Sequence, residues 1–201
     1  MKTIFSRITV AGLFATASIS CLVADESQSI AGHDLSHYQT QLHDENRVVR
    51  LRAVKSLGAF EKEAGPALIE ALKHDDAGVR YIAAVHLGRI GGDTLNSSVD
   101  LLTKLRGDHS SVAVQQAAAF SLCRAGMVDE YLPFLMERLA YPERAMACSA
   151  AELIGMIGPP AVAAVDVLEQ VKRDNPPAGK GDYHLGGVAG HALKKIKSDQ
   201  P

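Results

Sequence analysis

One motif of ten residues, Val-Arg-x-x-Ala-x-x-x-Leu-Gly, constrains the fold of this chain more than any other feature. It occurs at Val49–Gly58 and again, 30 residues later, at Val79–Gly88. Weaker copies keep the alanine and a leucine or isoleucine four residues after it, which we call the anchor, at Leu122, Ile154 and Leu193. A repeat of this length is one supersecondary unit that cannot bury its apolar face alone, so neighbouring copies must stack.

The stretch at 65–92 predicts the structure of one unit. Pro66 favours the first turn of a helix, because proline has no N–H to lose there. Apolar residues up to Leu72 then recur at helical spacing. Asp76 is a suitable N-cap for a second helix, since its carboxylate can accept from free N–H groups, and Gly91 ends that helix. The unit is therefore a helix, a short turn and a second helix.

Two further series of residues keep the period of the motif. The first is alanine, four residues before each anchor: Ala53, Ala83, Ala118, Ala150 and Ala189. The second is leucine in each first helix: Leu42, Leu72, Leu105, Leu139 and Leu168. A small residue at the alanine position lets helices approach closely, and the larger anchor fills the space beyond. The two series together predict stacked helix pairs with a continuous core.

The predicted fold class is all-α, an α-solenoid in which antiparallel helix pairs stack into a right-handed superhelix. Aromatic residues are 5% of the chain and tryptophan is absent, which suits closely packed helices better than a β-sandwich. A flexible lead at 25–33, a tail at 198–201 and a mobile Pro- and Gly-rich loop at 174–182 are also expected. We predict about five helix pairs, at 34–63, 65–92, 94–126, 129–158 and 159–197.

The first 24 residues have the pattern of a secretory signal peptide. Lys2 and Arg7 give a positive start, an apolar run follows, and Ala24 offers a small residue for cleavage. Lipidation of Cys21 is an alternative route, and an uncleaved N-terminal anchor is another. We therefore expect an exported protein, periplasmic or secreted, with a lipoprotein anchored to the membrane at Cys21 as the alternative.

The segment across the turn and second helix, D-x-x-V-R-x-x-A-x-x-x-L-G, resembles HEAT repeats of the short bacterial kind, often called phycobilisome-lyase-like. Two copies carry the resemblance, Asn46–Gly58 and Asp76–Gly88, and the three later copies lack the arginine. The resemblance extends over residues 34–197 and implies a HEAT- or armadillo-like solenoid. It also implies that the arginine pairs with an aspartate of the turn or of the next repeat.

One HEAT-repeat enzyme, deoxyhypusine hydroxylase, is a di-iron protein that uses His-Glu pairs. Three pairs in this chain are superficially similar: His33-Asp34, His43-Asp44 and His74-Asp75. The enzyme's pairs lie within the second helix, about six residues before the anchor. At those places this chain has Leu51-Arg52, Tyr81-Ile82, Gln116-Ala117 and Cys148-Ser149. The His-Asp pairs fall at turns or helix starts instead, where aspartate caps a helix, so we predict no metal and no cofactor.

Histidines recur at successive turns and leave one alternative open. His43, His74 and His109 could form a ridge of imidazoles that binds Zn²⁺ or Ni²⁺ weakly, although exposed polar turns are the simpler interpretation. His33 and His37 have ligand spacing on one helix face but no third ligand near them in sequence.

Neither nucleophilic catalysis nor a disulfide is indicated. The chain has no G-x-S-x-G motif, so we predict no catalytic residue. Cys123 and Cys148 are offset by seven helical residues between equivalent positions, about 10 Å along parallel helices, which is too far for a disulfide. We expect both to be small buried residues.

The charge balance and the solenoid together point to protein binding. A formal net charge of −2 argues against a nucleic-acid partner, which usually needs a basic surface. We predict a non-catalytic scaffold whose second helices line a concave wall for a protein or peptide partner. The alternatives are a HEAT-like subunit of a lyase or oxidoreductase, and a structural protein of the envelope. The expected contacts are Arg47, Arg50, Arg80, Tyr81 and Gln115.

Overall fold

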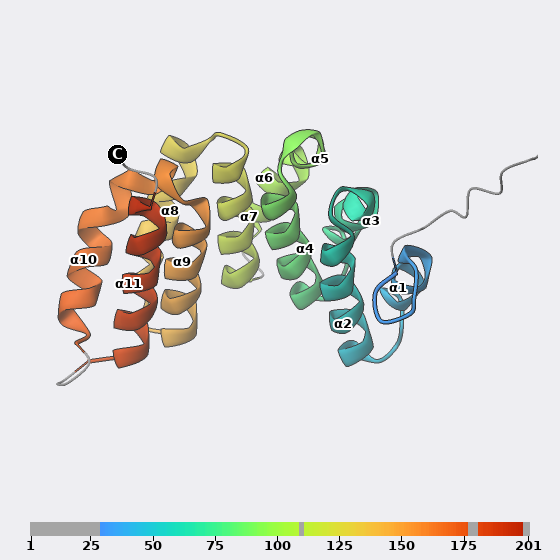
Figure 1. Cartoon of the computed structure of the whole chain (residues 1–201), viewed down its shortest axis with the longest axis horizontal. Helices are drawn as coiled ribbons and strands as arrows, with labels where there is room; N and C mark the ends of the chain where they lie inside the picture. The colour runs from blue at the N-terminus through green and yellow to red at the C-terminus, as the bar shows by residue number, and fades with distance from the viewer. Residues whose placement is uncertain (1–28, 109–110, 177–180, 199–201) are drawn as a thin grey trace, which may run out of the picture.

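The computed structural model describes residues 29–108, 111–176 and 181–198, which form an all-α solenoid of stacked helix pairs (Figure 1). The predicted fold class is thereby confirmed. Several predictions lie outside the described residues: the signal peptide at 1–24 with Cys21, the lead as far as residue 28, His109, the centre of the 174–182 loop and the tail beyond residue 198.

Each pair consists of a first and a second helix. The first helices are α1 (Leu35–Gln41), α3 (Gly65–Ala71), α6 (Val99–Gly107), α8 (Val128–Arg138) and α10 (Val165–Asp174). The second helices are α2 (Arg47–Leu57), α4 (Ala77–Ile90), α7 (Val112–Arg124), α9 (Arg144–Ile157) and α11 (Tyr183–Lys197). Short helical elements connect three of the pairs: η1 (Gly58–Ala64), α5 (Gly92–Ser97) and η2 (Pro159–Ala164).

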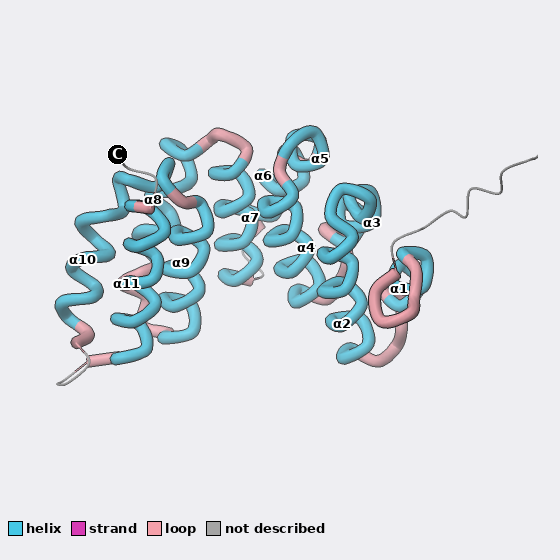
Figure 2. The backbone as a smooth tube through the Cα atoms, in the orientation of Figure 1, coloured by secondary structure: helices cyan, strands magenta, loops and turns pink. Residues whose placement is uncertain are grey.

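The pairs follow one another along the long axis of the molecule, from α1 at one end to α10 and α11 at the other (Figure 1). The second helices pack against each other in the order α2, α4, α7, α9 and α11. Short loops join the helices, as the tube view shows (Figure 2). In the described ranges, none of the helices combines the length and apolar character that crossing a bilayer requires.

Polar side chains fix where most second helices begin. Asn46 caps α2, and its side chain accepts from the N–H of Val48 at 2.9 Å. Asp76 caps α4 in the same way and accepts from the N–H of Gly78 at 2.8 Å. Such caps satisfy backbone donors that a helix leaves free at its first turn. The predicted role of Asp76 as an N-cap is confirmed.

The described end of the predicted flexible lead, residues 29–33, forms a turn, and the flexibility of the lead stays a prediction. Ile30 and His33 form two backbone hydrogen bonds with each other, of 2.8 and 3.0 Å. The hydroxyl of Tyr38, a buried residue of α1, donates to the carbonyl of Ile30 at 2.6 Å. The turn is therefore fastened to the first helix pair. No sequence pattern predicts this contact, because it depends on the position of one tyrosine in space.

The core follows the predicted register closely. Every alanine four residues before an anchor is fully buried, and so is every anchor except Leu193, which is nearly so. The first-helix leucines are also buried, with one exception. Leu105 is only half-buried, whereas Leu102 of the same helix is completely enclosed. In the third pair the fully enclosed leucine is thus Leu102, whereas the predicted Leu105 packs against the core from its edge.

The glycine that follows the anchor has a packing role that the sequence did not reveal. A Cβ atom on Gly58 would lie 2.0 Å from the ring of His86 in the next second helix. At Gly88 it would lie 2.6 Å from the Phe120 ring, and at Gly155 it would lie 2.8 Å from the Cα of Ala192. These glycines let successive second helices approach each other closely.

The central second helix, α7, is enclosed on all sides. Residues 114–123 are buried without exception. The neighbouring helices α4 and α9 approach each other over it, and the hydroxyls of Tyr81 and Ser149 lie 3.4 Å apart. Two second helices that are not neighbours in the stack therefore meet across α7. The wall of second helices is not an open surface at its centre.

The His86 site predicts a loss of stability in mild acid. Burial and the nearby charge of Arg89 lower the pKa of His86 below its ordinary value of 6.5. The unfolded chain therefore binds a proton more readily than the folded chain, and stability falls as the pH drops through and below that value. We expect the urea midpoint of the wild type to fall between pH 7.5 and 5.5 more than that of His86→Leu. Equal losses in both proteins would contradict this assignment.

Candidate partner-binding groove

The turns of the first two pairs are joined by a cluster of charges. Asp76 accepts from Arg47 at 3.1 Å and from Arg50 at 3.0 Å. Only 7% of the Asp76 side chain is exposed, against 19% for Arg50 and 64% for Arg47. Burial raises the pKa of Asp76, but the N–H of Gly78 and the two guanidiniums outweigh it and hold the pKa below its ordinary value.

Two of the predicted partner contacts belong to this internal network. Besides bonding Asp76, Arg50 donates to the carbonyls of Asp44 and Glu45, both at 2.9 Å. Arg80 donates to the carbonyls of His74 and Asp75, at 2.7 and 2.9 Å. A guanidinium that satisfies turn carbonyls holds the turn in place. Arg50 and Arg80 therefore have a structural role, and as partner contacts both stay predictions.

The other three predicted contacts lie in different environments. Gln115 is only 5% exposed, because α7 is enclosed by its neighbours, and as a partner contact it stays a prediction. Tyr81 is half-buried and meets Ser149 across α7. Arg47 remains largely exposed. Arg47 and Tyr81 stay predictions as contacts, and the structure does not bring them together with Gln115 into one site.

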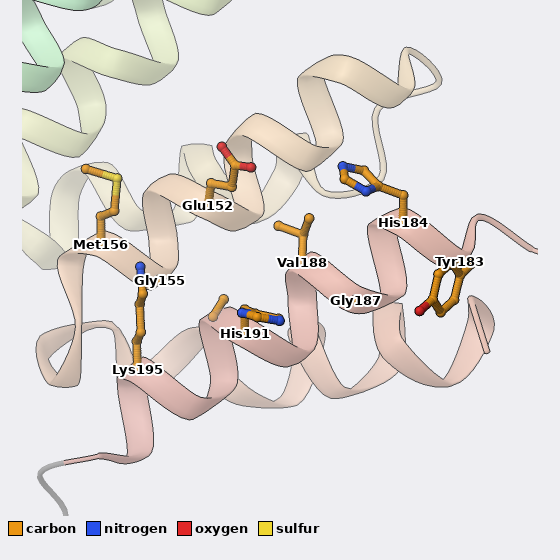
Figure 3. Close-up of a pocket in the computed structure, with 10 residues that line it drawn as sticks. Glu152, Gly155, Met156, Tyr183, His184, Gly187, Val188, His191 and Lys195 are labelled. Carbon is orange, nitrogen blue, oxygen red and sulfur yellow. The ribbon is translucent and has the colours of Figure 1, made fainter. Parts of the chain in front are cut away.

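A groove lies between α9 and α11 (Figure 3). Its volume is about 480 Å³. Figure 3 shows Val188 and Lys195 of α11 pointing toward α9, the helix that carries Glu152 and Met156. The residues that line it are Glu152, Gly155, Met156, Tyr183, His184, Gly187, Val188, His191, Ala192 and Lys195.

Small residues create the floor of this groove. Gly155 of α9 lies against the backbone of α11 at Ala192, where a Cβ would find its nearest atom 2.8 Å away. Gly187 is different, because a Cβ there would meet no atom within 4 Å. The two helices are therefore close together at Gly155, and space remains above Gly187. A groove of this form can accept the side chains of an extended or helical segment.

The lining combines apolar surface with charges of both signs. Met156 and Val188 supply apolar contact, and methionine adapts to ligands of different shapes. Glu152 and Lys195 supply one charge of each sign. Tyr183 stands at one end of the groove and is 66% exposed, which is unusual for a large apolar side chain. Exposed aromatic residues beside a groove are typical of binding surfaces.

The arrangement of α11 explains why the groove is open. Asp182 caps this helix by accepting from the N–H groups of His184 and Leu185, at 3.0 and 3.2 Å. Arg144, the first residue of α9, forms an ion pair with the same carboxylate. This ion pair joins the starts of the two second helices, as the Arg47 pair does between α2 and α4. The N-terminal end of the groove is thereby held at a fixed width.

The turn histidines do not form a metal site in the described part of the chain. The rings of His43 and His74 lie 6.5 Å apart, but both nitrogens of His74 are occupied. Its Nδ1 accepts from the N–H of Asp76 at 2.8 Å, and its Nε2 lies 3.2 Å from the carbonyl of Leu42. Residues 29–108, 111–176 and 181–198 contain no cluster of three metal-ligating side chains.

Both cysteines are free and buried, in agreement with the prediction. Burial raises the pKa of Cys123 to about 12, so its thiol is protonated at neutral pH and is a poor nucleophile. The pKa of Cys148 is also raised, mainly by burial and then by the charge of Asp182.

Sequence reasoning missed the groove, although one signal for it was present. Glu152, Met156, His191 and Lys195 occupy positions two residues before or after the anchors Ile154 and Leu193. Second helices of earlier pairs also expose residues at these positions, such as Lys55 and Arg89, so the positions alone do not single out the groove. What distinguishes α11 is that no later helix is stacked on it among the described residues. The signal was thus that these residues belong to the last two copies of the repeat.

A family model described as HEAT repeats matches residues 38–113. This finding confirms the resemblance inferred from the motif. The uncharacterized protein SkfG of Bacillus subtilis strain 168 is 31% identical over 117 residues, which are 58% of this chain and 65% of SkfG. The chain thus spans slightly less than two thirds of the length of this curated relative.

Two solved structures are similar in fold. An engineered protein from the Northeast Structural Genomics Consortium has a TM-score of 0.51 and 20% identity, with 83% of this chain and 80% of that chain covered. The complex of CpcE and CpcF of phycocyanin lyase from Nostoc sp. PCC7120 has a TM-score of 0.41 and 17% identity, with 81% and 82% covered. The first likeness concerns the fold alone, and the second is too distant to bear on function.

Proposed function

Because this chain is an all-α solenoid and a HEAT-repeat family model matches its residues 38–113, we propose that it is a non-catalytic scaffold that holds a protein or peptide partner. The groove between α9 and α11 carries this proposal. It is open, it combines apolar lining with one charge of each sign, and an exposed tyrosine stands at its end. These are properties of surfaces that bind peptide segments rather than of a site that activates a nucleophile.

Two further parts of the proposal come from the sequence. The pattern of residues 1–24 supports export, to the periplasm or the medium, with lipidation at Cys21 as the alternative. The structure adds that Cys123 is buried with a raised pKa, so its thiol does not offer a nucleophile. We therefore propose an exported binding protein without an enzymatic activity of its own.

Filling the groove should abolish binding without unfolding the protein. A side chain at Gly187 meets open space, and Gly187 has ordinary helical backbone, so Gly187→Trp should fold normally and occupy the groove. Peptides selected from a random library against the wild type serve as the probe, with fluorescence anisotropy as the measurement. We expect Gly187→Trp to weaken their binding by about a hundredfold or more, as expected when a central contact is lost.

The matched control is Gly107→Trp at the end of α6, where a Cβ also meets no atom within 4 Å. The wild type has no tryptophan, so each variant carries a single fluorescent reporter of its own environment. The control should bind the peptides as the wild type does. Equal binding by both variants, or a library that yields no peptide sensitive to Gly187→Trp, would refute the groove as the binding site.

A further inference from the structure

Two arginines stack on one phenylalanine where α6 and α8 meet, in the layer of first helices. The guanidinium carbon of Arg106, in α6, lies 3.5 Å from the centre of the Phe134 ring. The guanidinium carbon of Arg138, four residues after Phe134 in α8, lies 4.5 Å from the same centre and 5.1 Å from that of Tyr141. These stacking contacts hold both side chains in defined positions.

Neither arginine of this cluster forms an ion pair among the described residues, although the charge of Glu137 lies near enough to act on Arg106. No hydrogen bond or ion pair joins either guanidinium to another side chain or carbonyl in those ranges. The Nε atoms of Arg106 and Arg138 are buried and unpaired, whereas their terminal nitrogens are not buried. Each arginine therefore exposes its two terminal nitrogens to solvent, and their N–H groups can bind an oxyanion side-on.

The two charges are costly to keep together in the free protein. Phe134 is only 7% exposed and both arginines are half-buried, so water screens them incompletely. Burial, and then the charge of Arg138, lowers the pKa of Arg106 below its ordinary value. Half-buried arginines are usually paired with a carboxylate or a phosphate. An incoming oxyanion would relieve both the repulsion and the incomplete solvation.

We propose that Arg106 and Arg138 form a docking site for the acidic side chains of a protein partner, with Phe134 and Tyr141 as the platform that orients them. Two carboxylates from neighbouring turns or alternate residues of a partner match the two guanidiniums one for one. The site is formed by first helices and does not depend on the groove between α9 and α11. It goes beyond the proposed scaffold role by specifying the chemistry of one partner segment.

Charge complementarity favours an acidic protein segment over a nucleic acid or another polyphosphate. Only two cations are present in the cluster, and Glu137 lies close enough to influence the pKa of Arg106. A polyphosphate chain needs an extended series of cations, and the carboxylate of Glu137 would repel its next phosphate. An acidic peptide can instead place neutral residues beside Glu137.

Titration with a synthetic hexaglutamate peptide tests the site in the purified full chain. Arg106→Met and Arg138→Met keep an apolar stem against Phe134 and remove the charge. We expect either variant to raise the dissociation constant by about tenfold or more, as for the loss of a hydrogen bond between charged groups. The matched control is Arg52→Met in α2, an exposed arginine with no ion pair among the described residues, which should change the constant by less than about twofold.

Three outcomes separate this proposal from its rivals. Loss of hexaglutamate binding in both cluster variants, with their melting temperatures unchanged or raised, supports it. Unchanged binding, or early melting with unchanged binding, shows that the arginines serve only the packing of α6 and α8 and overturns it. Stronger binding of inorganic triphosphate than of hexaglutamate at these arginines overturns it as well. Gly187→Trp should leave hexaglutamate binding intact. A negative result at the groove therefore does not count against the arginine site, and the reverse also holds.

Discussion

Replacing Gly155 with alanine is expected to lower the free energy of unfolding by about 2 kcal/mol. The new methyl carbon would lie 2.8 Å from the Cα of Ala192 and 3.0 Å from its Cβ. Backbone atoms of α11 cannot rotate away as the end of a long side chain can. The two helices would have to separate, and the buried contacts of Ile154 and Leu193 beside them would loosen.

Gly187→Ala provides the matched control for this change. Both glycines lie within helices, and alanine has the higher helix propensity at either place by up to about 1 kcal/mol. At Gly187 the methyl group meets nothing within 4 Å, so only the gain in propensity remains and stability should rise. Opposite changes in the free energy of unfolding of the two variants would separate the effect of the close approach of α9 and α11 from the effect of helix propensity.

Urea unfolding followed by circular dichroism measures both effects. A lower midpoint for Gly155→Ala and a higher one for Gly187→Ala, with unchanged slopes, are the expected results. If Gly155→Ala were as stable as the wild type, the two helices would not be in the close contact described above.

The second large effect is expected at Asp76, where substitution by alanine should cost about 3 kcal/mol. Loss of the N-cap of α4 contributes about 1 kcal/mol. The remainder comes from Arg50, whose half-buried guanidinium would lose its only carboxylate partner among the described residues. The exposed pair with Arg47 adds little, because water screens it.

Asp76→Asn separates the charge from the cap. Asparagine caps a helix about as well as aspartate, so this variant should retain the cap and lose only the ionic contribution. It should therefore be intermediate in stability between the wild type and Asp76→Ala. If both variants were equally stable, the carboxylate charge would not contribute to the network.

The pH dependence of the same residue gives an independent check. The folded pKa of Asp76 is below its ordinary value of 3.8, so its contribution is complete above that value and is lost as the pH falls through the folded pKa. The wild type should therefore lose stability below about pH 4 more steeply than Asp76→Asn. Parallel acid profiles for the two proteins would contradict the linkage.

The sequence predicted the stacking of helix pairs because two independent series of residues shared one period. Ala83 and Leu87 fall four residues apart on one face of α4, and both are fully buried as expected. Local chemistry also placed the cap at Asp76. The short connecting elements were missed, since α5 and the two 3-10 segments lie between the repeated positions and follow no periodic pattern.

The candidate site was harder to predict, and the reason is geometric. The sequence predicts that second-helix residues pointing away from the anchors contact a partner. That prediction requires the wall of second helices to be open along its length. The enclosure of α7 buries Gln115, and the turn carbonyls occupy Arg50 and Arg80. Neither effect appears in a single repeat. The cluster at Arg106 and Arg138 was likewise hidden, because it joins residues from two different pairs.

The meeting of Tyr81 and Ser149 over α7 has a mechanical consequence. Straightening the array would pull these hydroxyls apart, because they join two helices that are not neighbours in the stack. The contact therefore favours the curvature that the middle of the molecule has now. A partner of the kind proposed above would bind against that curvature.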